Sequence, residues 1–408
     1  MAAVYFARWI LLPDGSILEN GAVVVDSGTI VSIGPRSRAK RTAADRTIKL
    51  GDVLLLPGLV NMHTHLEEGV LRGIGSPAEE TFAARLAKKN SRIRLAPEDA
   101  IRTSVRLGAR EALANGITMI VDSSRRGISP AILADEPIKA RVIHEFHPDD
   151  MMGEERVLEV LRERVANTPA NVPAGVGPYA LFSISPELHW SVIDHARREG
   201  RLWATHIAES AEEIEAYSEQ SGDLYFQITH RRPWGFGRVS QGPVHYALTH
   251  NLLPNRALLF HCNYVNGHEL SLLAAKHVAV GVSMRYAGAL GHKEFPLDVA
   301  LKRGITICAV TESIADAGSA SLFDELHVIK NRYPHIPVQE MLKWVTLNPA
   351  RALGIDHHIG SLQEGKVADI IGVRFAHEPS AEILEELVQE DPTISFVMVD
   401  GEEVIVDG

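Results

Sequence analysis

The chain has 408 residues, a formal net charge of −11 at pH 7 and two cysteines. It is longer than one bare α/β barrel of about 250 residues, which leaves room for a second small domain. The acidic balance argues against nucleic acid as the main partner, because nucleic acid needs a basic face, and two cysteines exclude a disulfide framework.

The N-terminal segment has the character of a strand rather than of a targeting or membrane segment. Its apolar run AVYFARWILL is interrupted by Arg8 and is followed by a Pro-Asp-Gly turn instead of a cleavage site. No apolar run approaches the roughly 20 residues of a membrane span. Cys262 and Cys308 lie in apolar, strand-like segments. We therefore expect a protein of the reducing cytoplasm with no membrane partner.

The two ends of the chain share one character. Residues 1–56 contain GAVVVDSGTIVSIG, and residues 359–408 contain IGSLQEGKVADIIGV and SFVMVDGEEVIVDG. Asp-Gly and Ser-Gly turns between β-branched runs are hairpin signals. Since neither end has enough apolar surface for its own core, we predict that both form one small composite β-sandwich domain. The acidic stretch 378–392 is expected to be a solvated helix on that domain.

The middle of the chain, residues 57–358, alternates between strand-like and helix-like stretches. The strand-like runs, in chain order, are LLLPGLVNMHTH, GITMIVDSS, ARVIHEF, AGVGPYALFSI, RLWATHIAES, ALLFHCNYV, HVAVGVS and GITICAV. Eight strand and helix units predict an α/β fold, a (β/α)8 or TIM barrel. The carboxyl ends of the parallel strands of such a barrel carry its chemistry.

The first of these strands is the most informative, because it ends in the triplet His63-Thr64-His65. The period of two in a strand places His63 and His65 on the same face. Two neighbouring imidazoles can hold one metal ion. The position after a buried strand favours a metal pair over a chance pair in a loop.

Further polar residues stand at the ends of later strands. His206 ends the run LWAT and is followed by Glu209, His261 ends ALLF, and Glu312 follows ITICAVT. Each residue alone is more often structural, but together they place imidazoles and carboxylates on one rim of one barrel. Such a set is costly unless it binds a cation. Three imidazoles and one carboxylate suit Zn²⁺ or Fe²⁺, with a position left open for water.

Five motifs carry a family resemblance that runs nearly from end to end: PGLVNMHTHL, THIAES, LLFHCNYV, TLNPARALG and GSLQEGKVADI. They resemble motifs of the amidohydrolase superfamily, in the branch of the cytosine, guanine, S-adenosylhomocysteine and aminofutalosine deaminases and the triazine hydrolases. The resemblance implies a distorted (β/α)8 barrel with a composite β-sandwich. It also implies one divalent metal ion, Zn or Fe, with the ligands His63, His65, His206 and Glu312. Two-metal members use a lysine on the fourth strand, which AGVGPYALFSISPEL lacks.

The resemblance also implies a mechanism. A divalent ion lowers the pKa of its bound water towards neutrality and so supplies a hydroxide. Glu209 matches the proton shuttle of the family, and His261 matches the histidine that orients the attacking water. Glu312 would ligate the metal and accept a proton. The predicted reaction is hydrolytic deamination of an amino-purine, an adenosyl derivative or a related N-heterocycle, with release of ammonia.

Three departures from the family pattern lie close to these residues. Glu312 stands in a VTES sequence where the family usually has an aspartate, and Asp316 is the alternative acid. Tyr179 stands where a histidine is common, and VGVSMRYAG, which contains Arg285, replaces the usual seventh-strand motif. Both positions usually touch substrate, so we predict Tyr179 and Arg285 as substrate-binding residues. Changes at these positions indicate an altered substrate or a decayed activity.

Two alternatives to a deaminase stay open. The same metal could serve a hydrolase that displaces halide from a chloro-heterocycle or opens a cyclic amide. A catalytically silent relative could keep the fold as a binding protein, but a dead site has no physical need for both Glu209 and His261. The partner expected for either enzyme is a small-molecule substrate, and a homo-oligomer is left open.

Other conspicuous residues have ordinary interpretations. Arg125 and Arg126 could hold a substrate anion or form salt bridges. Core or interface positions are expected for the tryptophans Trp190, Trp203 and Trp234. The histidines that we do not expect to be ligands are His144, His147, His292, His357 and His358.

Overall fold

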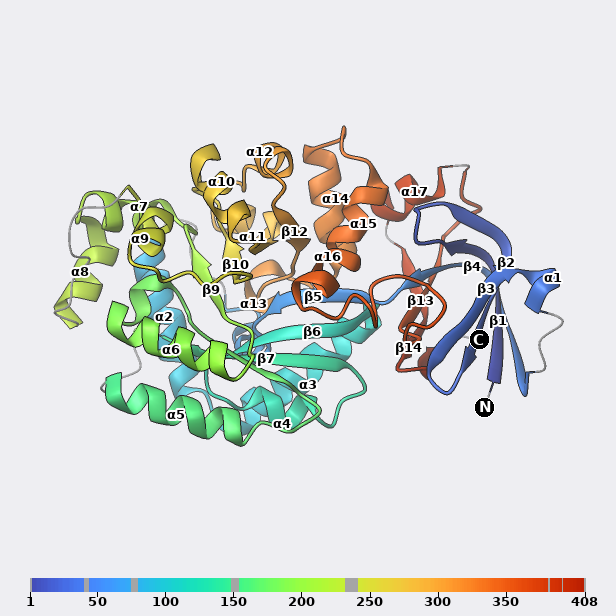
Figure 1. The fold of residues 1–408 in the computed structure, drawn as a ribbon, viewed down its shortest axis with the longest axis horizontal. Helices are drawn as coiled ribbons and strands as arrows, with labels where there is room; N and C mark the ends of the chain where they lie inside the picture. The colour runs from blue at the N-terminus through green and yellow to red at the C-terminus, as the bar shows by residue number, and fades with distance from the viewer. Residues whose placement is uncertain are drawn as a thin grey trace.

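The structure is a computed structural model that describes residues 2–39, 44–74, 80–147, 154–231, 241–380, 382–390 and 392–406. A sheet that contains the N-terminal strands lies at the right of Figure 1, and the larger α/β part extends to the left. Trp234 lies outside the described residues. Within those ranges, no helix has both the length and the apolar character that crossing a membrane requires.

A seven-stranded sheet joins the two ends of the chain, in the order β15-β14-β13-β4-β1-β2-β3. Its strands are β1 (Ala2–Leu11), β2 (Ile17–Asp26), β3 (Thr29–Pro35), β4 (Arg46–Pro57), β13 (Ile370–Arg374), β14 (Thr393–Val399) and β15 (Glu402–Val406). The ends meet where β4 pairs antiparallel with β13, with Leu54 opposite Val373. In the described residues, hydrogen bonds link both ends into one sheet. Its organisation as a β-sandwich remains a prediction.

The acidic stretch 378–392 contains a helix, α17 (Ile383–Gln389), as the sequence predicts. This helix is not solvated all round, because its apolar side chains are buried: Ile383, Leu384, Leu387 and Val388. The carbonyl of Val388 lies 3.1 Å from Nδ1 of His327 on helix α14 (Leu322–Arg332). One face of α17 therefore packs against the α/β part.

All eight strand-like runs of the middle segment form parallel strands. One sheet has the order β5-β6-β7-β8, and the other has the order β12-β11-β10-β9. Their bounds are β5 (Leu59–Thr64), β6 (Ile117–Ser124), β7 (Lys139–Phe146), β8 (Ala174–Pro178), β9 (Ala204–Ile207), β10 (Leu258–His261), β11 (Ala279–Val282) and β12 (Thr306–Ala309). The strands are buried over nearly their whole length because helices and neighbouring strands cover both of their faces.

Helices follow these strands and cover the sheets (Figure 1). In chain order, the remaining helices are α1 (Arg36–Ala39), η1 (Leu66–Leu71), α2 (Phe82–Leu95), α3 (Glu98–Ala114), α4 (Ser129–Leu133), α5 (Glu154–Ala166), η2 (Leu181–Ser183), α6 (Pro186–Arg198), α7 (Ala211–Ser218), α8 (Gly222–Arg231), α9 (Pro243–Thr249), α10 (Gly267–Ala275), α11 (Met284–Ala289), α12 (Leu297–Lys302), α13 (Ile314–Ala317), α15 (Val338–Trp344) and α16 (Leu347–Ala352). The alternation of strand and helix is the α/β pattern that the sequence predicts.

The two parallel sheets meet along two seams. At the first, single parallel bridges pair Val176 with Trp203 and Ala180 with His206. At the second, the side chain of Asn61, in β5, donates to Oγ1 of Thr311, just after β12, over 2.7 Å. Both seams bring the sheet of β5 to β8 next to the sheet of β9 to β12.

Gly177 lies at the first seam and permits the close approach of β8 and β9. A Cβ atom at this position would lie 1.8 Å from the carbonyl oxygen of Ala204. We predict that Gly177→Ala lowers the free energy of unfolding by about 2 kcal/mol or more, since only a backbone shift can relieve the overlap. Denaturant and thermal unfolding measure this change. Gly288→Ala is the control, because its Cβ meets nothing within 4 Å in α11, and it should be neutral or slightly stabilising. Equal stability of the two variants would contradict the close approach.

Candidate metal centre and active site

The candidate metal ligands lie at the carboxyl ends of three strands. His63 lies in β5 and His65 directly after it, His206 lies in β9, and Glu312 follows β12. The chain turns within a few residues after β9, β11 and β12, because a serine caps the helix that follows each strand. These serines, each accepting a backbone N–H of its helix, are Ser210, Ser283 and Ser313. Because each helix begins so soon, the loops between strand and helix are short, and they hold their polar side chains at the ends of the strands.

Four side chains can each offer one ligand atom, and these atoms all lie within 4.8 Å of one another: His63, His65, His206 and Glu312. Nε2 of His206 lies 3.0 Å from Nε2 of His63 and 3.3 Å from Nε2 of His65. Oε1 of Glu312 lies 3.0 Å from Nε2 of His63. All four side chains are buried. The structure therefore brings together the four ligands that the sequence predicts.

Burial sets the charge state of this group. It lowers the pKa of His63, His65 and His206 well below the usual value, so the imidazoles are neutral and keep a free lone pair. Burial raises the pKa of Glu312 to about 7, against the lowering effect of His261. Oε1 of Glu312 is buried and has no hydrogen-bond partner in the described structure. Neutral imidazoles around an unsatisfied carboxylate oxygen fit a divalent cation such as zinc.

A backbone contact orients His206 towards this group. Its Nδ1 lies 2.6 Å from the carbonyl oxygen of Tyr179. Since a carbonyl only accepts, Nδ1 carries the proton and Nε2 is the free nitrogen. A ligating histidine usually donates its other ring N–H in this way. Tyr179 thus supports the metal group through its backbone.

Two residues of the site have left-handed backbone conformations. The φ angles are 71° at His261 and 60° at Glu312. Such angles cost roughly 1–3 kcal/mol for a residue with a side chain and persist where the surroundings fix them. The hydroxyl of Thr64 donates to the carbonyl of Glu312 over 3.2 Å, which ties this turn to the end of β5. Strain of this kind is common at functional sites.

Glu209 lies beside the metal group and is almost completely buried. Burial by itself would raise the pKa of this carboxyl, but electrostatic interactions with the neighbouring imidazoles of His261 and His292 outweigh burial and lower the pKa to about 2. The Tyr286 hydroxyl donates to Oε1 over 2.9 Å, and the Tyr179 hydroxyl donates to Oε2 over 3.4 Å. Nε2 of His261 lies 3.5 Å from Oε2. Glu209 is therefore an ionised carboxylate that can accept a proton.

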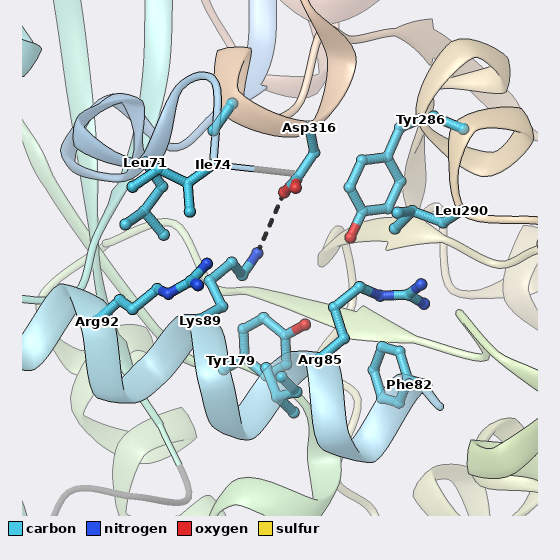
Figure 2. Close-up of a pocket in the computed structure, with 13 residues that line it drawn as sticks. Leu71, Ile74, Phe82, Arg85, Lys89, Arg92, Tyr179, Tyr286, Leu290 and Asp316 are labelled. Carbon is cyan, nitrogen blue, oxygen red and sulfur yellow. Dashed lines mark ion pairs between the residues drawn. The ribbon is translucent and has the colours of Figure 1, made fainter. Parts of the chain in front are cut away.

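A cavity of about 170 Å³ lies next to Glu209. Tyr179 and Tyr286 line this cavity and also donate to Glu209, so the cavity adjoins the site. Helix α2 forms one wall, as Figure 2 shows. The lining residues are Leu71, Ile74, Phe82, Arg85, Leu86, Lys89, Arg92, Tyr179, Tyr286, Ala289, Leu290, Ala315 and Asp316. Its aromatic and charged side chains suit a ligand with a flat ring and polar substituents.

Arg285 and Asp316 do not lie where the sequence predicts them. Arg285 is expected to contact substrate, and Asp316 is the alternative to Glu312 as the acidic metal ligand. Nη2 of Arg285 donates to the carbonyl of Ala317 over 2.6 Å and to Oγ of Ser319 over 3.1 Å, so this guanidinium fastens a loop and does not line the cavity. Asp316 lines the cavity and pairs with Nζ of Lys89 over 3.5 Å. It is not one of the four grouped ligand candidates.

Arg125 and Arg126 hold neighbouring segments together rather than line the cavity. The Arg125 guanidinium donates to the side chain of Asn90 on α2. Nη1 of Arg126 donates to the carbonyl of Ala96, just after α2, over 2.9 Å. Of the two alternatives for this pair, structural bonding is what the structure shows.

The tryptophans and remaining histidines stand apart from the metal group. Trp203 is buried, while Trp190 is half exposed and donates to the carbonyl of His250. His292 is no ligand candidate, but its Nε2 lies 3.9 Å from Oε1 of Glu209. None of the five histidines set aside by the sequence belongs to the grouped ligands of the described residues: His144, His147, His292, His357 and His358.

Sequence reasoning missed several residues of the site. Tyr286 directly follows Arg285, and only the course of α11 shows which of the two faces the cavity. Lys89 lies on α2, and its Nζ pairs with Oε2 of Glu68 over 3.0 Å. Glu145, in β7, lies beside His65, 3.9 Å from its Nδ1. No motif marks Lys89, because the sequence does not reveal that α2 faces the strand ends.

The family model described as "Amidohydrolase family" matches residues 54–404. The chain belongs to the amidohydrolase family. This match covers the strands that carry every ligand candidate, and it confirms the resemblance that the motifs carry. The described residues have an α/β fold with parallel strands, and this fold matches structures of the TIM-barrel type.

Similar proteins extend the comparison over nearly the whole chain. A 5-methylthioadenosine/S-adenosylhomocysteine deaminase of Syntrophobacter fumaroxidans is 28% identical over 383 residues, which are 89% of this chain and 82% of that protein. The structure of an adenosine deaminase from Xanthomonas campestris with bound zinc has a TM-score of 0.86 at 20% identity and covers 99% of this chain and 93% of that one. The structure of an atrazine chlorohydrolase from Arthrobacter aurescens complexed with zinc has a TM-score of 0.83 at 20% identity. The match covers 99% of this chain and 95% of that one. Since one fold carries both reactions, the fold alone does not select between them.

If the grouped ligands hold one ion, the purified protein should contain about one divalent metal ion per chain. Chelation should remove it and lower the melting temperature, because a ligand of the folded state stabilises that state. His206→Ala should lower metal content several-fold, as measured by elemental analysis. His144→Asn is the control: His144 is buried but contacts Thr168 outside the group, so metal content should not change. A full metal complement in His206→Ala would contradict the ligand assignment.

Proposed function

We propose that this chain is a cytoplasmic, metal-dependent hydrolase that deaminates an adenosine derivative or a related amino-purine. The observation that carries the proposal is the ionised, buried carboxylate of Glu209 beside the group of ligand candidates. A carboxylate in this place can take a proton from water and deliver it to a ring nitrogen. The deaminase named for the Syntrophobacter relative requires such a shuttle.

The metal ligands in this proposal are His63, His65, His206 and Glu312, and the ion is one Zn²⁺ or Fe²⁺. When bound, the ion lowers the pKa of a water molecule and polarises it for attack. The lack of a lysine on β8 supports one ion rather than two. The neutral imidazoles would bind the ion without prior loss of protons.

The protein side chains divide the remaining work. Glu209 accepts a proton from the attacking water at Oε2 and donates it to the ring nitrogen beside the attacked carbon. Tyr286 and Tyr179, which donate to its two oxygens, hold this carboxylate in place. His261 lies between Glu209 and Glu312, 3.6 Å from Oε1 of the latter, where it orients the water. Glu312 accepts the second proton, from the hydroxyl that has added to the ring carbon, and delivers it to the amino group, which leaves as ammonia.

The substrate assignment rests on the names of similar proteins and on the cavity. Both the Syntrophobacter relative and the Xanthomonas structure are named for adenosine compounds. Phe82, Tyr179 and Tyr286 supply aromatic faces to the cavity, which suit a planar base. We therefore assign to Tyr179 and Tyr286 the substrate contact first predicted for Tyr179 and Arg285.

The proposal includes the architecture that holds the site. Residues 57–358 would form one closed, distorted (β/α)8 barrel through the two seams, and residues 1–56 and 359–408 a composite β-sandwich domain. The shared sheet of β4 and β13 supports this division, since it joins both ends beside the barrel. The free, buried thiols of Cys262 and Cys308 support a reducing compartment.

Glu209→Gln tests the proton shuttle. It keeps the size of the side chain but cannot accept the proton, so we predict a fall in kcat of about 10²-fold or more with metal content unchanged. The measurement is ammonia release from 5′-methylthioadenosine and S-adenosylhomocysteine by the metal-loaded protein. Glu213→Gln is the matched control. Burial raises the pKa of Glu213 to about 8, so its carboxyl is mostly protonated at pH 7 and glutamine replaces it closely.

Near-full activity of Glu209→Gln would remove Glu209 from the mechanism. Release of chloride from a chloro-triazine, without ammonia from any amino-purine, would replace the proposed reaction by the halide-displacing alternative. Release of neither by protein with a full metal complement would favour the catalytically silent relative.

A further inference from the structure

The wall that α2 contributes to the cavity is positively charged. Arg85, Lys89 and Arg92 line the cavity, and their spacing of four and three places them on one face of the helix. Figure 2 shows these side chains along one side of the cavity, with Asp316 and Tyr286 opposite. The chain as a whole has a net charge of −11, so this wall departs from its general character.

The charge of Lys89 is compensated within the protein. Its Nζ lies 3.0 Å from Oε2 of Glu68 and 3.5 Å from Oδ2 of Asp316. Lys89 and Asp316 line the cavity, and Glu68 is buried beside Lys89. The positive charge of Lys89 is therefore neutralised by two carboxylates of the protein, so it is not available to pair with a charged ligand.

The charge of Arg85 is not compensated in this way. Its side chain is only 8% exposed, and among the described residues no carboxylate forms an ion pair with it. The contact that it makes is with a histidine ring, since Nη2 lies 3.4 Å from Nε2 of His292. Burial lowers the pKa of His292, so this imidazole is neutral and accepts the guanidinium N–H without supplying a negative charge. A buried guanidinium beside a neutral partner is costly unless an anion reaches it.

The position of Arg85 ties such an anion to the reacting molecule. His292 contacts Arg85 on one side and lies 3.9 Å from Oε1 of Glu209 on the other. A group held by Arg85 is thus one imidazole away from the proposed proton shuttle and within the same cavity. The planar guanidinium pairs with the oxygens of a carboxylate or a phosphate through two parallel hydrogen bonds.

We propose that Arg85 binds an anionic substituent of the substrate, so that the substrate class is an adenosine derivative that carries a carboxylate or a phosphate. This inference rests on the proposed deaminase function and narrows it. Arg92, which is less buried at the far end of the same wall, adds a positive field but is not required.

The test compares acidic and neutral substrates on the metal-loaded protein. The probes are S-adenosylhomocysteine, which carries a carboxylate, adenosine 5′-monophosphate, which carries a phosphate, and 5′-methylthioadenosine, which carries no acid. Ammonia release gives kcat and KM, and calorimetry gives Kd. The wild type should prefer at least one acidic probe, and which one it prefers identifies the anion.

Arg85→Gln should lower kcat/KM for the preferred acidic probe about 10- to 100-fold, mainly through KM and with a matching rise in Kd. It should change the neutral probe less than about 3-fold. Arg85→Lys keeps the positive charge but cannot form two parallel hydrogen bonds. Its kcat/KM for the acidic probe should therefore lie between those of Arg85→Gln and the wild type. Arg94→Gln removes an arginine from the exposed side of α2 and should alter neither probe.

Two results would overturn the inference and leave the deaminase in place. One is an equal loss of kcat/KM on acidic and neutral probes in Arg85→Gln, which would make Arg85 a structural residue. The other is a wild type that shows no preference for either acidic probe. If the metal-loaded protein neither binds any of the three probes nor releases ammonia from them, the proposed function fails and this inference fails with it.

Discussion

Three neutral imidazoles and one carboxylate meet at the carboxyl ends of β5, β9 and β12, and the rest of the site is arranged around them. His63, His65, His206 and Glu312 are buried, and an oxygen of Glu312 lacks a hydrogen-bond partner in the described structure. Polar groups buried at this density raise the free energy of the fold unless a cation joins them. The buried strands beneath, covered on both faces, hold the group in place despite that cost.

The electrostatic environment changes sharply over the short distance from this group to the cavity wall. The imidazoles of the group are neutral, whereas Glu209 beside them is ionised and accepts two tyrosine hydroxyls. Beyond it, Lys89 is neutralised by acids of the protein, while Arg85 has only a neutral imidazole. In the proposed mechanism, this order would separate three tasks along one cavity: holding a cation, moving a proton and binding an acidic substituent.

The sequence predicts the strands, and the grouping of the candidate ligands, because both depend on local signals. Each of the eight runs is short, apolar and bounded by turns, and the strand-end rule then collects His63, His206 and Glu312 on one rim. The prediction for Arg285 has less support from the structure because the next residue, Tyr286, faces the cavity instead. A helix begins at this point, and one residue along a helix turns the side chain by about 100°.

The sequence by itself determined the parallel α/β pattern, which follows from periodicity and turn chemistry within short segments. It also carried the family and the set of candidate ligands, through the resemblance of its motifs to those of the amidohydrolases. Only the tertiary structure decided the charge states. Glu209 and Glu312 are the same residue type, and both are buried close to strand ends, yet the pKa is lowered to about 2 in the first and raised to about 7 in the second. The difference comes from groups distant in sequence. Several neighbouring imidazoles outweigh burial at Glu209, whereas at Glu312 burial and the carboxylate of Glu209 outweigh the lowering effect of His261. Burial and distance between remote segments are properties of the folded chain, so no local pattern encodes them.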